Sequence, residues 1–122
     1  MNEIKSYKDL LIWKKGITIV KLVYQLVKTF PQEEIYALSS QLKRASVSIP
    51  SNIAEGYGRN GNKDYLKFLN IAIASLFEMQ TQLEIAFNLK YINETQFKKT
   101  FEESREIERM LSSFYKKIKE RT

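Results

Sequence analysis

The stretch Ser40–Gly56, SQLKRASVSIPSNIAEG, decides the fold because two patterns with helical spacing run through it. Apolar residues recur every three or four positions, as they do along the buried face of an α-helix. This apolar stripe consists of Leu38, Leu42, Ala45, Ile49 and Ile53. A polar stripe with the same spacing lies about 100° away around the helix, and it consists of Gln41, Arg44, Ser48, Asn52 and Glu55. The stretch therefore predicts one helix, from about Ile35 to Tyr57, with a core face and a separate polar face.

Pro50 lies in the middle of this predicted helix. Proline has no backbone N–H and its ring crowds the carbonyl four residues earlier, which costs about 3 kcal/mol in an ordinary helix interior. The helix either breaks at Ile49 or continues with a kink. Because the apolar stripe keeps its phase from Leu42 to Ile53, we expect a continuous helix that is kinked at Pro50.

The polar stripe has two interpretations. A solvated helix face is the simpler one, but such a face usually carries long charged side chains, whereas Ser48 and Asn52 are short and poor helix formers. Short polar side chains allow a second backbone to approach closely. We therefore expect a packed polar seam against another helix, another subunit or a ligand. Glu55, which we place near Arg44 on the same stripe, is the one acid that we would examine for catalysis.

The three-four spacing of apolar residues extends over nearly the whole chain, and no segment has the pattern of a strand. Three further helices are predicted, with approximate bounds 7–29, 62–89 and 94 to a frayed end within 116–121. Ser6 with Asp9, and Asn93 with Gln96, have the spacing of capping boxes. Because the connections are short, neighbouring helices should pack antiparallel. The predicted fold is all-α, a single domain over residues 1–122 that forms an up-down-up-down four-helix bundle.

Residues 7–29 carry two apolar stripes, although a bundle core needs only one. The first has heptad spacing, and we predict that it packs in the bundle: Leu10, Trp13, Ile17, Val20, Tyr24 and Val27. The second consists of Ile12, Gly16, Ile19, Val23, Leu26 and Phe30. Residues 62–89 likewise combine a heptad seam, from Tyr65 to Ala86, with further apolar residues. The excess reflects either tight wrapping or a subunit interface, and we expect the interface because monomers seldom expose so much apolar surface.

The composition excludes several kinds of active site. The chain of 122 residues contains no His and no Cys, which removes the commonest general base, the Ser-His and Cys-His nucleophiles and thiolate metal sites. We therefore expect no metal, no cofactor and no enzymatic activity. No segment has the pattern of a signal peptide or of a membrane span, so we expect a cytoplasmic protein without a membrane partner.

The net charge of +6 and the pI of about 9.5 favour a polyanionic partner such as nucleic acid, although a soluble protein can also simply be basic. The candidate phosphate-binding residues are Lys14, Lys21 and Lys28, which recur every seven residues, the adjacent pair Lys43 and Arg44, and Arg59, Lys63 and Lys67 around a predicted turn. A basic tail follows at the end of the chain, with Lys116, Lys117, Lys119 and Arg121. No base-reading motif is present, so we expect binding that is weak and tolerant of sequence.

The stretch Ile53–Asn62, IAEGYGRNGN, matches the G-x-G-x-x-G spacing of a dinucleotide-binding loop. That loop follows a strand of a βαβ unit, whereas a helix precedes it here. We expect conformational roles instead: Gly56 or Gly58 adopts the left-handed conformation that ends the helix, and Gly61 lets the chain turn into the next one. The start of that next helix then offers free N–H groups to a phosphate beside Arg59.

Residues 48–59, SIPSNIAEGYGR, resemble the hallmark of the four helix bundle protein family, whose members are encoded in intervening sequences of bacterial large-subunit rRNA genes. The likeness covers nearly the whole chain, although the family usually has Ser where this chain has Gly61. It implies a bundle that assembles into a ring, commonly a pentamer. Fold relatives of the family, the accessory variability proteins of diversity-generating retroelements, bind a reverse transcriptase and nucleic acid, so the resemblance implies both as partners.

Two functions remain as hypotheses. In the first, the protein is a homo-oligomer that binds RNA or DNA through its basic surfaces. In the second, it is a protein-interaction scaffold in which the apolar faces and the polar seam do the binding, while lysine and arginine only keep it soluble.

Overall fold

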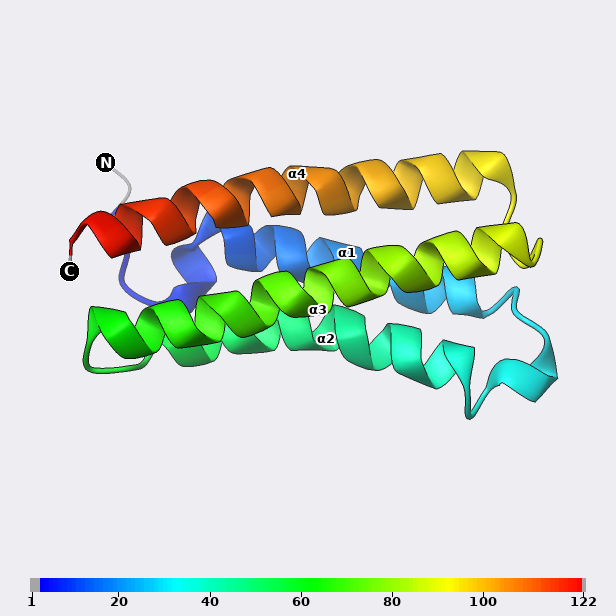
Figure 1. Cartoon of the computed structure of the whole chain (residues 1–122), viewed down its shortest axis with the longest axis horizontal. Helices are drawn as coiled ribbons and strands as arrows, with labels where there is room; N and C mark the ends of the chain where they lie inside the picture. The colour runs from blue at the N-terminus through cyan, green and yellow to red at the C-terminus, as the bar shows by residue number, and fades with distance from the viewer. Residues whose placement is uncertain (1–2, 122) are drawn as a thin grey trace.

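A computed structural model describes residues 3–121, so that Met1, Asn2 and Thr122 of the predicted domain lie outside it. The described residues form four α-helices and contain no strand (Figure 1). The helices are α1 (Leu11–Val27), α2 (Leu38–Tyr57), α3 (Asn62–Asn88) and α4 (Glu94–Glu120), and two short 3-10 helices, η1 (Tyr7–Asp9) and η2 (Gln32–Glu34), precede α1 and α2. Successive helices run in opposite directions, each packs on the next, and α4 packs back on α1. The predicted all-α four-helix bundle is confirmed.

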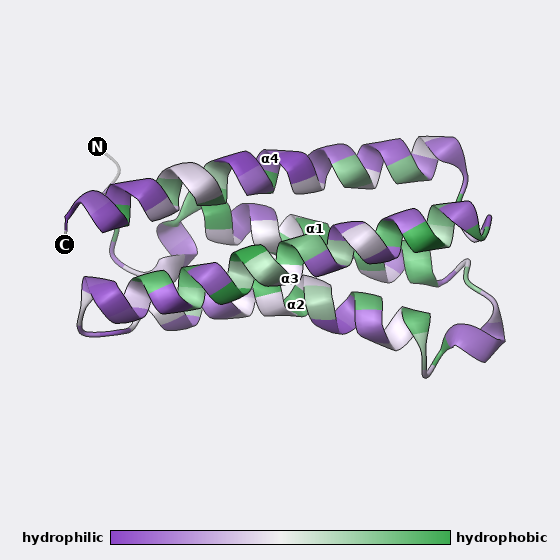
Figure 2. Cartoon of the chain, in the orientation of Figure 1, coloured by the Kyte–Doolittle hydropathy of each residue, from purple (hydrophilic) through white to green (hydrophobic). Residues whose placement is uncertain are grey.

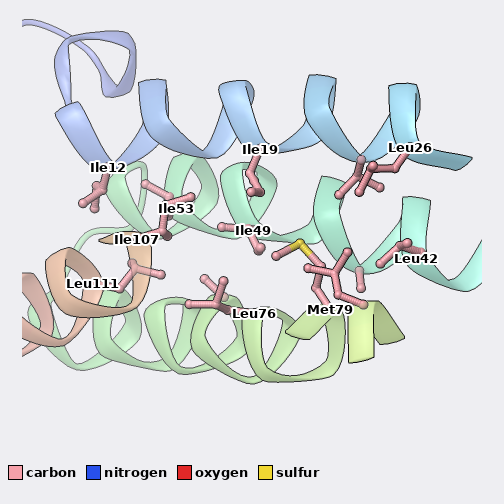
Figure 3. Packing of buried hydrophobic residues seen from close by; sticks show 14 of the residues in the cluster. Ile12, Ile19, Leu26, Leu42, Ile49, Ile53, Leu76, Met79, Ile107 and Leu111 are labelled. Carbon is pink, nitrogen blue, oxygen red and sulfur yellow. The ribbon is translucent and has the colours of Figure 1, made fainter. Parts of the chain in front are cut away.

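All four helices contribute to one hydrophobic core (Figure 3). The apolar stripe predicted for the second helix is buried along its whole length, and Leu42, Ile49 and Ile53 are fully inaccessible to solvent. Leu76 and Met79 of α3 and Ile107 and Leu111 of α4 point toward the same centre. In contrast, α4 is mostly hydrophilic along the face seen in Figure 2. The core therefore lies on the bundle axis, as the spacing of the apolar residues predicts.

The heptad stripe of α1 faces the core only toward its ends, so the prediction is wrong for the middle of the stripe. The second stripe is buried instead, namely Ile12, Gly16, Ile19, Val23, Leu26 and Phe30. Of the heptad stripe, Leu10 and Val27 are buried at its two ends, Trp13, Ile17 and Val20 are only partly buried, and Tyr24 is 42% exposed. Both stripes have helical spacing, so the choice between them depends on the partner helix. Gly16 allows α1 to lie directly against α2, which turns the heptad stripe toward the edge of the bundle.

The helix termini agree with the predicted capping boxes. Asn93 Oδ1 accepts a hydrogen bond from the Gln96 N–H at 2.8 Å, and the Asn93 N–H donates to Gln96 Oε1 at 2.9 Å. Ser6 and Asp9 form the same reciprocal pair, but they cap the 3-10 turn η1. Leu10 is extended, with ψ of 127°, so α1 begins four residues later than predicted. Helix α2 also begins later than predicted because residues 32–37 form η2 and a turn.

The glycines of residues 53–62 do not have the conformational role that we predict. No glycine has a positive φ. Gly58 caps α2 with φ of −79°, and Gly61 is extended with φ of −160°, which any residue adopts. Gly56 has a packing role, because a Cβ at this position would lie 2.8 Å from Tyr65 Cδ1 and 3.0 Å from Phe68 Cβ. The absence of a side chain therefore lets α2 and α3 approach closely at their shared end.

Pro50 is buried inside α2, and the helix is continuous from Leu38 to Tyr57. The predicted continuity is confirmed, and the kink stays a prediction. The proline ring faces Gly16 of α1.

Candidate functional site

The polar stripe of α2 lies beside α3. Two of its residues are partly buried there, and the other three are exposed to solvent. Ser48 Oγ accepts hydrogen bonds from Ser75 Oγ of α3 at 2.8 Å and from Asn52 Nδ2 at 2.9 Å. Asn52 Nδ2 also donates to the Ser48 carbonyl at 2.8 Å. The two short side chains therefore form a polar contact between helices. The other three members, Gln41, Arg44 and Glu55, are exposed.

Glu55 forms an ion pair with Arg59, one turn later, with Oε2 and Nη2 3.6 Å apart. Arg44 lies eleven residues before Glu55, about 16 Å along the helix axis, so our placement of Glu55 near Arg44 is wrong. The side chains of Glu55 and Arg59 are 59% and 47% exposed. An exposed ion pair of this kind contributes little to stability, and nothing in its geometry resembles a catalytic carboxylate in a cleft.

Helix α3 supplies two polar residues that the sequence reasoning missed. Ser75 and Gln82 are spaced by seven residues and are both buried. Gln82 is 5% exposed, and its Nε2 donates to Glu78 Oε2 at 3.3 Å. Its Oε1 is buried and has no hydrogen-bond partner among the described residues. Their spacing on an otherwise apolar helix face was the available signal, because it places both side chains on the edge that meets α2.

The predicted phosphate-binding residues fall into two groups. Lys14, Lys21 and Lys28 are exposed along the outer edge of α1. Lys43 belongs with them, because its Nζ lies 5.0 Å from the centre of the Tyr24 ring of α1. Arg44 is exposed on α2.

The second group consists of Arg59, Lys63 and Lys67, which are exposed around the turn between α2 and α3. Figure 1 shows that this turn lies at the same end of the bundle as the C-terminus of α4. We call this end the basic end, and it consists of Arg59, Lys63, Lys67, Lys116, Lys117, Lys119 and Arg121. The acidic residues of the same segments are Glu55, Asp64 and Glu120.

The side chains of the basic end are partly ordered by aromatic residues. The Arg59 guanidinium lies 4.5 Å from the centre of the Phe68 ring. Burial, with a smaller contribution from the neighbouring Tyr57, raises the pKa of Tyr65 to about 12, and Arg121 acts in the opposite direction. Gly61, the N-cap of α3, provides no side-chain hydrogen bond for the N–H groups of the first turn of that helix.

Two apolar grooves flank α1. The α1/α2 groove has a volume of about 300 Å³ and is lined by Tyr7, Trp13, Ile17, Val20, Val47, Pro50, Ser51 and Ala54. The α1/α4 groove has a volume of about 370 Å³ and is lined by Leu10, Leu11, Ile12, Arg109, Met110, Ser113, Phe114 and Lys117. Both are shallow and mostly apolar, which suits a protein segment better than a polar metabolite.

Among residues 3–121 no cluster of acidic side chains could hold a metal ion. Within the same residues, every helix is too short or too polar to cross a bilayer.

Two comparisons with known proteins gave a match, one to a family model and one to a solved structure. The family model described as 23S rRNA-intervening sequence protein matches residues 8–113. The chain also resembles a crystal structure of a protein with unknown function from the S23 ribosomal protein family of Bacteroides thetaiotaomicron, with a TM-score of 0.81 and 26% identity over 87% of this chain and 99% of that chain. No curated protein matches. Neither match names an enzymatic activity.

Proposed function

Because this chain belongs to the 23S rRNA-intervening sequence protein family, we propose that it is a non-enzymatic protein that assembles into a homo-oligomeric ring, a pentamer, and binds RNA or DNA weakly and without sequence preference. The family resemblance of residues 48–59 supports both the pentamer and the binding of nucleic acid. The positive surface charge is a second support for the binding of nucleic acid.

The basic end carries the nucleic-acid part of the proposal. Residues from the α2–α3 turn and from the end of α4 are far apart in the sequence, and folding places them at one end of the bundle. Contacts to phosphate require only such charges, and each one releases counterions from the nucleic acid. Arg59 is held by Phe68 and Glu55, whereas Lys63 and Lys67 extend into solvent. The arrangement suits a flexible polyanion better than a base-specific reader.

The uncovered apolar residues support the homo-oligomeric part. Trp13, Ile17 and Val20 are only partly buried, and they line a groove together with Val47, which is 39% exposed. Contiguous apolar surface of this kind usually marks a protein interface.

The test for nucleic-acid binding is a titration of labelled RNA at increasing salt with the wild type and with Arg59→Glu/Lys63→Glu. Wild-type binding should weaken steeply with salt, and the variant should lose roughly tenfold in affinity, with a salt slope lower by about 2 because two phosphate contacts are lost.

Lys98→Glu/Lys99→Glu is the matched control, since it changes the net charge equally at the other end of the bundle. It should retain more affinity than the variant of the basic end. The nucleic-acid proposal fails if the wild type does not bind RNA at low salt, if binding is insensitive to salt, or if both variants lose the same affinity.

A protein-interaction scaffold without a nucleic-acid role is the second candidate, and the two apolar grooves favour it. A protein that stays bound to the purified chain after nuclease treatment, together with no binding of RNA, would support the scaffold.

A further inference from the structure

Among the surfaces that expose apolar side chains, two differ in shape. One is the α1/α2 groove. The other is the connector knob, which consists of Ile35 and Tyr36 in the connection between α1 and α2. Tyr36 is 96% exposed and Ile35 is 48% exposed. A tyrosine that makes almost no contact within its own chain is unusual, because this side chain can bury about 150–250 Å² in a protein contact.

The connector knob is held in place by its neighbours. Glu34 Oε1 accepts a hydrogen bond from the Leu38 N–H at 3.2 Å, and Glu34 Oε2 accepts one from the Tyr91 hydroxyl at 2.8 Å. Glu34 thus ties the connector both to the start of α2 and to the α3–α4 turn. Ile35 and Tyr36 follow directly and project from this fixed point, so less entropy is lost when they bind than for a flexible loop.

The charges beside the two surfaces are opposite in sign. The exposed Glu33 and the carboxylate of Glu34 accompany the connector knob. Lys14 and Lys21 lie three and four residues from Ile17 on α1, so they project beside the α1/α2 groove. Opposite charges around an apolar contact favour one orientation of binding and exclude others.

A chain cannot fill its own groove with its own knob. The knob precedes α2, whereas Val47, the groove residue of α2 nearest to it, lies nine residues after Leu38, about 14 Å along the helix axis. The two surfaces can therefore meet only between copies.

We infer that Tyr36 of one copy inserts into the α1/α2 groove of the next copy, with Glu33 facing Lys14 and Lys21. A contact between two different surfaces is heterologous, and repeated heterologous contacts close into a ring when the rotation permits. The inference rests on the proposed homo-oligomeric assembly and names the surfaces that form it. It also assigns Lys14 and Lys21 to the subunit contact and leaves the basic end for nucleic acid.

The experiment uses two variants of the full chain and measures their mass by light scattering. Tyr36→Ala removes the knob, and Val47→Glu places a charge in the groove. Each variant alone should lose the oligomer and have the 14.4 kDa mass of one chain. An equimolar mixture should form a heterodimer of about twice the 14.4 kDa mass, because Val47→Glu retains a knob and Tyr36→Ala retains a groove. Since each variant must keep one working surface, the heterodimer also shows that both variants fold.

Leu11→Glu is the matched control. Leu11 is 60% exposed and lines the α1/α4 groove, so the same type of substitution should leave the oligomer intact. If Leu11→Glu dissociates the oligomer and Val47→Glu does not, the α1/α4 groove is the acceptor and the inference is wrong.

The remaining outcomes separate the inference from the proposed function. If the wild type is an oligomer and Tyr36→Ala retains its mass, the connector knob is not in the interface, although the homo-oligomer stands. If both variants dissociate and their mixture stays monomeric, Tyr36 of one copy does not bind the α1/α2 groove of another copy, and the inference is wrong. A monomeric wild type would overturn both the ring and the contact.

Discussion

Gly16 of α1 lies directly against Pro50 of α2, so closely that a Cβ on Gly16 would be 3.1 Å from the proline Cβ and 3.3 Å from its Cδ. The contact joins the two residues that helix propensity alone would count as defects. In the tertiary structure, the missing side chain of Gly16 makes room for the proline ring, and the close approach decides which stripe of α1 is buried.

Gly16→Ala should therefore destabilise the protein. Alanine favours a helix by about 1 kcal/mol over glycine, but overpacking a filled contact costs about 1–3 kcal/mol. Because the Pro50 ring is rigid and buried, we expect overpacking to dominate and to lower the free energy of unfolding by about 1 kcal/mol in urea titrations. At Gly61, the N-cap of α3, no atom beyond the chain neighbours lies within 4 Å of the added methyl, so Gly61→Ala should cost only the roughly 0.5 kcal/mol by which alanine is a poorer N-cap than glycine. Equal stability of the two variants would contradict the proposed packing.

Gly56→Ala should be more harmful than Gly16→Ala. The added Cβ would lie 2.8 Å from Tyr65 Cδ1 and 3.0 Å from the Cβ of Phe68, so α3 must move away from α2. We expect a loss of about 2–3 kcal/mol in the free energy of unfolding. Gly58→Ala serves as control, because its nearest neighbours would be carbonyl oxygens at 3.6 and 3.8 Å and its φ of −79° suits alanine. A Gly58→Ala variant as unstable as Gly56→Ala would favour a conformational role for these glycines after all.

The hydrogen bond between Ser48 and Ser75 should be detectable as a coupling energy. Ser48→Ala leaves the Ser75 hydroxyl without its acceptor, and Ser75→Ala removes a donor to Ser48. Each single change should cost about 1 kcal/mol, and the double variant should cost less than the sum because neither hydroxyl is then left unpaired. Thermal or urea unfolding of the four proteins measures the coupling. Strictly additive losses would show that the hydrogen bond between Ser48 and Ser75 contributes nothing to stability.

Tyr65 should make stability fall at alkaline pH. Its hydroxyl is buried without a hydrogen-bond partner among residues 3–121, and burial is the main cause that raises its pKa to about 12 from the ordinary value of 10.0. The unfolded chain therefore loses the phenol proton first, so stability decreases as the pH rises from 10 toward 12. Tyr65→Phe should remove this contribution and, since no hydrogen bond is lost, should keep or slightly raise stability at pH 7. A clear loss of stability at pH 7 would show that the hydroxyl has a partner.

Local pattern was sufficient for the features that depend on neighbouring residues in the chain. The capping box of Asn93 and Gln96 correctly located the start of α4, since both hydrogen bonds form within one turn. The stripe of Leu42, Ile49 and Ile53 correctly identified the core face of α2 and its continuity through Pro50. These features depend on the spacing of residues along one helix, which can be read from the sequence.

The features that the sequence reasoning missed depend on residues from different helices. The orientation of α1 depends on the fit of Gly16 against Pro50, and the role of Gly56 depends on Tyr65. The glycines of residues 53–62 suggested a turn that requires a left-handed backbone conformation. The structure shows instead that Gly56 is needed because a side chain there would clash with Tyr65.

The candidate surfaces were only half predictable for the same reason. The sequence by itself determined four helices, an excess of positive charge and more apolar surface than one core can bury. Only the tertiary structure decided that the α2–α3 turn and the end of α4 share a basic end, that Trp13 and Val47 share a groove, and that Tyr36 is almost fully exposed in the connection between α1 and α2. A helical pattern defines the faces of one helix, whereas the packing of side chains between helices determines which faces meet and which remain exposed.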